Sequence, residues 1–357
     1  LGRQSWSLAY EGYAPAQEEL REALCTLGNG YFATRGAAPD ARADDTHYPG
    51  TYIAGVYDRI VSEVAGRDVE NEDLVNMPNW LPLTFRVGDG PWFRIDDVDV
   101  LSYRQELDLE GGVLHRDFDF RDAEGRTTRC RERRIVSMAD PHLASIAVEW
   151  TPLDWSGRIT VRSAIDGGVV NDGVARYRAL DGRHLQVLEV ARVGHDALFL
   201  RCETKQSSIR VAMASRTRLF RGVREVEVER HAQTEGNEAV EELSCDAEEG
   251  SPITAEKVVA IHTSRDRAIA EPGLASKEAI SRAGRFDELL EPHRTAWRHL
   301  WEDCDIELHD GSAPDTELKL RVHIFHLLQT ASSHSADLDV GIPARGWHGE
   351  AYRGHIF

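Results

Sequence analysis

Short segments in which apolar and polar residues alternate recur through the first 265 residues of the chain. A period of two places the apolar side chains on one face of a β-strand, and residues typical of turns separate the segments. The segments lie at residues 84–87, 92–95, 113–120, 131–137, 146–150, 158–162, 184–190, 197–201, 208–213 and 253–262. Many short strands with regular turns predict a large antiparallel β-sandwich.

Two of these segments predict a β-hairpin. Residues 84–87 and 92–95 both alternate, and Gly-Asp-Gly-Pro stands between them at 88–91. Asp-Gly provides the backbone conformations that a tight hairpin turn requires. We therefore expect the two segments to pair directly.

The pattern becomes helical after the Glu-Pro-Gly sequence at 271–273. Apolar residues recur at helical spacing over residues 276–303, and we expect Pro292 to divide this stretch into two helices. Residues 305–308 predict a short strand, and residues 316–332 predict a further helix. Because one such helix cannot bury its own apolar face, we expect its partners in sequence beyond this chain.

The composition excludes several classes of partner. The 357 residues carry a net charge of −19, which argues against binding to nucleic acid or to anionic membranes. No segment approaches the roughly 18 apolar residues of a membrane helix, and no secretory pattern opens the chain. The five cysteines are widely spaced, so neither a disulfide framework nor a zinc site is predicted. We expect a cytoplasmic protein with reduced cysteines and no bound metal.

The last fourteen residues are dense in rings, charges and hydrogen-bonding groups, between three glycines. Such a segment is costly to fold unless something binds there. We interpret it as one wall of a polar ligand pocket whose other walls lie beyond residue 357. The candidate binding residues are Arg345, Trp347, Glu350, Tyr352, Arg353, His355 and Phe357.

Two further patterns have competing interpretations. His323, His326 and His334 invite a metal site, but no acidic third ligand is near, and packing on an apolar helix is the preferred alternative. Gly28-Asn29-Gly30 lacks the length and the lysine of a phosphate loop. We expect this sequence to form a tight turn between strands and Arg35 to make a structural ion pair.

Five blocks together resemble the family 65 glycoside hydrolases and phosphorylases, which include maltose, trehalose, kojibiose and nigerose phosphorylases. They are LGNGYFATRG at 27–36, GTYIAGVY at 50–57, VNMPNW at 75–80, RIVSMAD at 134–140 and GEAYRGHIF at 349–357. The resemblance implies a β-sandwich over residues 1–268, a helical linker over 269–312 and the first part of an (α/α)6 catalytic barrel over 313–357. The rest of the barrel would follow Phe357.

The resemblance also implies an activity. The expected enzyme is an inverting phosphorylase that cleaves an α-glucosyl disaccharide with inorganic phosphate as co-substrate and no cofactor. Its products would be β-glucose 1-phosphate and an acceptor sugar, and a homodimer is implied. The general-acid Glu would lie downstream of Phe357, so no catalytic residue is expected here and this chain alone should be inactive. A hydrolase that uses water, or a non-catalytic carbohydrate-binding or assembly module, remain the alternatives.

Roles for the terminal residues stay open between substrate contact and structure. Arg345 and Arg353 would grip sugar hydroxyls or pair with Glu350, which would make hydrogen bonds in the pocket rather than act as the acid. Trp347 and Tyr352 would stack on a sugar ring or pack, and His355 would orient the segment that follows.

A loop in the sandwich is a second candidate. Asn76, Asn79 and Trp80 lie in a segment fixed by two prolines. The resemblance implies that this loop shapes the acceptor pocket. A rigid interface between domains or subunits is an equally weighted interpretation.

Overall fold

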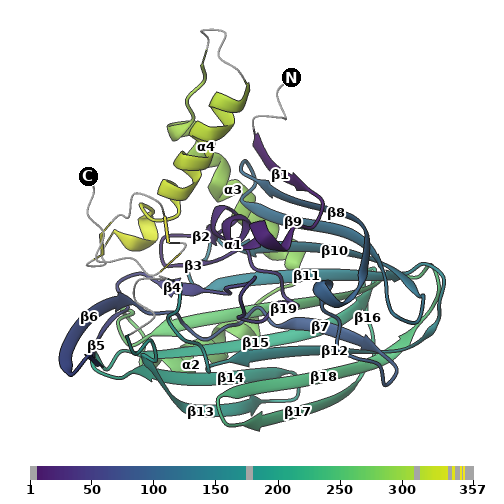
Figure 1. The fold of residues 1–357 in the computed structure, drawn as a ribbon, viewed down its shortest axis with the longest axis horizontal. Coiled ribbons are helices and arrows are strands. Elements are labelled where there is room, and N and C mark those ends of the chain that lie inside the picture. The colour runs from purple at the N-terminus through teal and green to yellow at the C-terminus, as the bar shows by residue number, and fades with distance from the viewer. Residues whose placement is uncertain are drawn as a thin grey trace.

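Two antiparallel sheets pack face to face over most of the chain (Figure 1). The computed structural model describes residues 6–173, 180–308, 314–336, 340–341, 346–347 and 349. The large sheet contains, in spatial order, β1 (Ser7–Glu11), β8 (Asp99–Asp108), β9 (Val113–Arg121), β10 (Thr127–Val136), β11 (Leu143–Pro152), β19 (Ile253–Thr263), β15 (Arg210–Arg221), β14 (Ala197–Thr204) and β13 (Leu185–Val193), with β16 (Arg224–Glu225) beside β15. The facing sheet contains β17 (Glu229–Glu235), β18 (Glu238–Ala247), β12 (Gly157–Asp166) and β7 (Leu83–Val87).

Smaller elements flank the sandwich. They are a three-stranded sheet of β2 (Leu27–Gly28), β3 (Phe32–Thr34) and β4 (Thr51–Ile53), and a hairpin of β5 (Tyr57–Val64) and β6 (Arg67–Leu74). The helices are α1 (Pro15–Leu24), α2 (Pro272–Arg282), α3 (Phe286–Cys304) and α4 (Pro314–Leu328), with 3-10 turns at Ile95–Asp97 and Ser333–Ser335. None of the described helices is long and apolar enough to cross a bilayer.

Alternate residues of β11 are buried on opposite faces of the large sheet, so this strand contributes to two packed layers. Ile146 and Val148 belong to the core between the two sheets. Ala147, between them, faces the other way and packs under Phe286 and Leu290 of α3. Helix α2 covers the same outer face of the large sheet further along, over β14, β15 and β19. The prediction of a mainly antiparallel β-structure is therefore confirmed for the described residues, whereas the division at 268 and 312 stays a prediction.

The predicted hairpin at 84–95 is wrong. β7 pairs with β12 of the facing sheet instead, and residues 91–94 are not a strand. One backbone contact between the two segments exists, because Phe93 N donates to Phe85 O over 2.7 Å. Pro91 has no N–H to extend this ladder, and the Phe85 and Phe93 rings stack inside the core. Tertiary packing thus overrides the local hairpin signal.

Three predictions in the helical part also need correction. α3 runs without a break through Pro292, because Phe286, Leu290, Trp297 and Trp301 bury one continuous face. Residues 305–308 form no strand. The predicted helix 316–332 ends at Leu328, and the Ser332 side chain caps the 3-10 turn that follows by accepting from His334 N. α1, within the part expected to be mostly strand, was not predicted.

Helix α4 is anchored to α3 by an aromatic stack. Phe325 stacks on Trp297 with ring centroids 4.6 Å apart, and Trp301 meets Trp6 edge to face at 4.9 Å. The Arg321 guanidinium lies 4.1 Å above the Trp6 ring and donates to both carboxylate oxygens of Asp305. These contacts fix the orientation of α4 relative to the sandwich.

A buried histidine ties the β5–β6 hairpin to the large sheet. His184 Nδ1 lies 3.2 Å from Asp58 Oδ2, and its Nε2 lies 3.2 Å from Asp73 Oδ2. Burial lowers the pKa of His184, but the hydrogen bond to Asp58 and the two carboxylate charges outweigh it and raise the pKa to about 9. The clamp is therefore an ion pair at neutral pH.

This clamp predicts a pH-dependent stability. Because the folded pKa lies above the unfolded value of 6.5, the stabilisation is complete below that value and is lost as the pH rises through about 9. We expect His184→Gln to lower the free energy of unfolding by about 3 kcal/mol at about pH 6 and by less at about pH 10. Urea unfolding of both proteins at the two pH values measures this. His195→Gln, whose side chain is 91% exposed, is the control and should change little. An equal loss at both pH values would contradict the charged clamp.

Candidate functional site

A polar cleft of about 1110 Å³ opens between three segments of the sandwich. One wall is the loop 39–49 between β3 and β4, the second is the segment 76–84 after β6, and the third is residues 162–173 at the end of β12. The acidic residues of its described lining are Glu19, Asp40, Asp44, Asp45, Asp166, Asp172 and Glu238, and the basic ones are Arg42, Arg162 and His47. The described groups therefore favour neutral or cationic ligands over anionic ones.

The predicted acceptor loop forms part of this cleft, but not with all three residues. Asn76 and Asn79 line it. Asn76 Oδ1 accepts from Thr51 N over 3.1 Å, so the amide also holds the loop to β4. Trp80 is fully buried and donates from Nε1 to Thr34 Oγ1 over 3.0 Å. The indole thus supports the loop from inside the core, and Trp80 is not among the residues that line the cleft.

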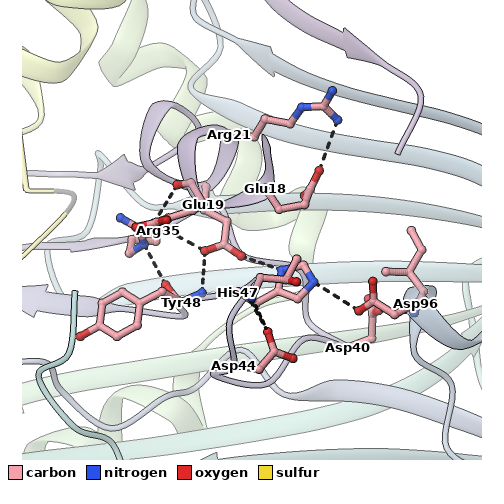
Figure 2. Close-up of polar contacts among 12 residues, drawn as sticks. Glu18, Glu19, Arg21, Arg35, Asp40, Asp44, His47, Tyr48 and Asp96 are labelled. Atoms are coloured by element: carbon pink, nitrogen blue, oxygen red, sulfur yellow. Dashed lines mark hydrogen bonds and ion pairs between the residues drawn. The ribbon is translucent and has the colours of Figure 1, made fainter. Parts of the chain in front are cut away.

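His47 joins three segments at the back of the cleft (Figure 2). Its Nδ1 lies 2.9 Å from Glu22 Oε1 on α1, and its Nε2 lies 3.5 Å from Asp96 Oδ2. Burial lowers the pKa of His47, but Glu22 and Asp96 outweigh this and raise it. No sequence pattern predicts this trio, because its members are far apart along the chain and no motif joins them.

Arg35 makes the structural pair that was predicted from its position. Its Nη2 lies 3.5 Å from Glu22 Oε2, and its Nε donates to Tyr48 O over 2.8 Å. Tyr48 N in turn donates to Glu22 Oε2 over 2.9 Å. Figure 2 shows Arg35 and Tyr48 beside α1, where they connect the helix to the cleft loop.

The Gly28-Asn29-Gly30 sequence forms the expected tight turn between β2 and β3. Asn29 Oδ1 accepts from Tyr31 N and Phe32 N, both over 3.0 Å. Its Nδ2 donates to Ser137 O over 2.8 Å. The turn is thereby fixed to the end of β10.

The outer side of this turn receives α4 and the residues after it. Ser332 Oγ donates to Asn29 O over 2.6 Å, and His334 Nδ1 lies 2.9 Å from the same oxygen. Gln329 Nε2 donates to Thr26 O over 3.0 Å, and His326 Nε2 lies 3.2 Å from Leu24 O. Two of the three candidate histidines thus contact backbone carbonyls, and the described residues contain no group of three metal-ligand side chains.

Most of the terminal candidate residues lie outside the described part of the chain. These are Arg345, Glu350, Tyr352, Arg353, His355 and Phe357. Trp347 is described and is 2% exposed. Its ring packs with Tyr52, Tyr57 and Leu74 on the small sheets, which corresponds to the packing alternative. Trp347 therefore fixes the start of the polar segment against the sandwich.

Comparison with known proteins identifies both parts of the chain. Residues 8–300 match the N-terminal domain of glycosyl hydrolase family 65, and residues 321–357 match the central catalytic domain of that family. A putative kojibiose phosphorylase from the human microbiome has the same fold, with a TM-score of 0.82 at 19% identity over 100% of this chain and 45% of that one.

Three curated relatives span essentially the whole chain. An uncharacterized glycosyl hydrolase of Mycobacterium tuberculosis is 45% identical over 99% of the chain and 26% of its own length. A kojibiose phosphorylase of Caldanaerobacter subterraneus and a trehalose 6-phosphate phosphorylase of Lactococcus lactis are each 30% identical over 100% of the chain, and over 45% and 44% of their own lengths. The chain thus spans less than half the length of these relatives. Because the match to the N-terminal family domain extends over residues 8–300, the chain belongs to glycosyl hydrolase family 65.

Proposed function

We propose that the protein to which this chain belongs is an inverting glycoside phosphorylase that acts on an α-glucosyl disaccharide. Inorganic phosphate would attack the anomeric carbon on the face opposite the leaving sugar, and β-glucose 1-phosphate would form. A carboxylic acid must protonate the leaving oxygen, and we expect that acid downstream of Phe357. Membership of family 65 and the relatives named as phosphorylases support this reaction class.

The observation that carries the proposal is the docking of the catalytic-domain segment onto the sandwich. Side chains at the end of α4 and just after it contact the backbone carbonyls of Leu24, Thr26 and Asn29. Trp347 is then buried on the small sheets. The described residues after α4 are therefore held against the sandwich, and a fixed attachment of this kind favours pre-organised contacts to a substrate.

We assign the sandwich cleft to the acceptor side of the reaction. Asn79 offers a side-chain amide that hydrogen-bonds sugar hydroxyls, and the acidic side chains accept from them. The Asn76 amide is buried and already bonds Thr51 N and Val170 O, so its part is to hold the loop. The surplus of carboxylates in the described lining favours an uncharged acceptor sugar over a sugar phosphate, because a phosphate dianion would be repelled. Disaccharides of the kojibiose, trehalose or maltose kind meet this requirement.

Phosphate dependence tests the proposal. The full-length protein is incubated with kojibiose, trehalose and maltose, with and without phosphate, and glucose 1-phosphate and glucose are quantified. We expect glucose 1-phosphate to appear only with phosphate and to be the β-anomer by NMR. The 357-residue chain alone is the control and should release neither product.

A hydrolase is the second candidate, and the relative named a glycosyl hydrolase favours it. Glucose release at the same rate without phosphate would replace the phosphorylase proposal by hydrolysis. Sugar binding without any turnover by the full-length protein would support a non-catalytic module instead.

A further inference from the structure

A hydrogen bond is missing from the β7–β12 ladder where it borders the cleft. Leu83 and Ser163 pair, and Ala164 N donates to Pro82 O over 3.1 Å at the next position. In an antiparallel pair the reverse bond would run from the N–H of residue 82 to Ala164 O. Pro82 has no N–H, so the ladder leaves the Ala164 carbonyl without its donor.

Lys257 supplies that donor from the opposite sheet. It lies on β19 with 0% of its surface exposed, and its Nζ donates to Ala164 O over 2.7 Å and to Pro82 O over 3.0 Å. A fully buried lysine is rare because desolvation of the ammonium is costly. Two short bonds to carbonyls and the buried carboxylate of Glu241 oppose that cost, but desolvation still lowers the pKa of Lys257 to about 7.

The same place in the ladder sets the position of two cleft residues. Beyond Pro82 the register shifts by one residue, so that Asn79 rather than Trp80 faces Asp166. Asn79 N donates to Asp166 O over 2.7 Å, and Asp166 N donates to Asn79 O over 2.9 Å. Pro82, Ala164, Asn79 and Asp166 all line the cleft. The Lys257 bonds therefore lie between the regular ladder and the irregular bridge that carries Asn79 and Asp166.

We propose that Lys257 is a positioning residue of the cleft: its Nζ replaces the N–H that Pro82 lacks, and it thereby holds Asn79 and Asp166 in place for the acceptor sugar. The ligand part of this inference rests on the proposed function. The structural part does not.

Hydrogen–deuterium exchange of the full-length protein tests the structural part. In Lys257→Met the bridge loses its support, and we expect exchange at the Asn79 and Asp166 amides to become at least about tenfold faster. Pro82→Ala restores an N–H opposite Ala164 O, so the double variant Pro82→Ala/Lys257→Met should exchange nearly as slowly as the parent. Lys277→Met, on α2 and away from the cleft, is the matched control and should leave both amides unchanged. Unchanged exchange in Lys257→Met, or no rescue in the double variant, overturns the proposal.

Kinetics of the full-length protein test the ligand part. With β-glucose 1-phosphate and glucose as substrates of the reverse reaction, Lys257→Met should raise KM for glucose about tenfold with little change in kcat, and the double variant should reverse this. A purely structural role would not produce a rise in KM that Pro82→Ala corrects, so an unchanged KM overturns the positioning role. If no phosphorolysis occurs at all, the proposed function fails, whereas the exchange experiment still decides whether Lys257 holds the bridge. Should Lys257→Met fail to fold while the double variant folds, the rescue itself supports the proposal.

Discussion

Replacing Glu132 by alanine is expected to lower the free energy of unfolding by about 3–5 kcal/mol. Glu132 lies on β10 and is 2% exposed. It accepts from Arg134 Nη2 over 2.5 Å and from Arg134 Nε over 3.1 Å, and its other oxygen lies 3.1 Å from Arg116 Nε. Both arginines are buried, so the substitution leaves two guanidinium groups in the interior with fewer acceptors. An uncompensated buried charge costs far more than a lost surface contact.

The Glu132 prediction is tested by urea unfolding of the 357-residue chain. Glu149→Ala is the matched control, because Glu149 is on the neighbouring strand β11 and lies 3.6 Å from Arg131 in a solvent-exposed pair. That pair should contribute only about 0–1 kcal/mol. Similar losses in the two variants would show that burial of the network contributes nothing. Arg116 Nη2 also donates to Asp40 Oδ1 over 2.6 Å. Because Asp40 lies in the loop 39–49 that lines the cleft, we expect this loop to become more mobile when the network is disrupted.

Substitution of Gly30 by alanine is expected to lower the free energy of unfolding about as much as Glu132→Ala does. It should also reduce the activity of the full-length protein strongly. Gly30 has φ +91°, and a Cβ there would lie 1.8 Å from Ser332 Oγ. Ser332 would have to move and give up its bond to Asn29 O, which adds about 1–3 kcal/mol to a backbone strain of about 1–2 kcal/mol. Because Ser332 precedes the polar terminal segment, we expect turnover by the full-length protein to fall about 100-fold.

A second glycine with positive φ and open space around it serves as the control that separates the clash with Ser332 from the backbone strain. Gly236 has φ +61° and no atom within 4 Å of an added Cβ. Gly236→Ala should therefore lower the free energy of unfolding through backbone strain alone. Ser332→Gly in the Gly30→Ala background removes the colliding atoms and should recover part of the turnover. If Gly30→Ala behaved like Gly236→Ala in both assays, the docking of the segment after α4 would not matter for activity.

All the period-two segments except residues 92–95 correspond to strands in the structure, because alternation directly encodes which side chains face a core. The pairing partners were not encoded in the same way. Residues 84–87 predicted a strand correctly and its partner wrongly, since the stacking of Phe85 on Phe93 and the ladder to β12 depend on the facing sheet. Pro292 is a similar case, because the buried face of α3 outweighs a local breaker.

The residues that meet at the candidate site are even harder to predict from the sequence than the pairing of the strands. Asn76 and Asn79 were singled out from one loop, and the cleft does include them. Nothing in the sequence connected Glu22, His47 and Asp96, which meet only after three segments fold together. Trp80 was grouped with the asparagines because it follows them, yet its side chain points into the core.

The sequence by itself determined the β-rich class of the larger part, the helical character of the part that follows and, through five ordered blocks, the family. These properties depend on local periodicity and on motifs that can be read along the chain. The tertiary structure alone decided that a lysine on β19 bonds the carbonyl that Pro82, beside the facing sheet, leaves without a donor, and that Asn29 O accepts from Ser332, 303 residues away along the chain. Such contacts cannot be read from spacing, because a side chain satisfies whichever buried group the packed sheets bring to it.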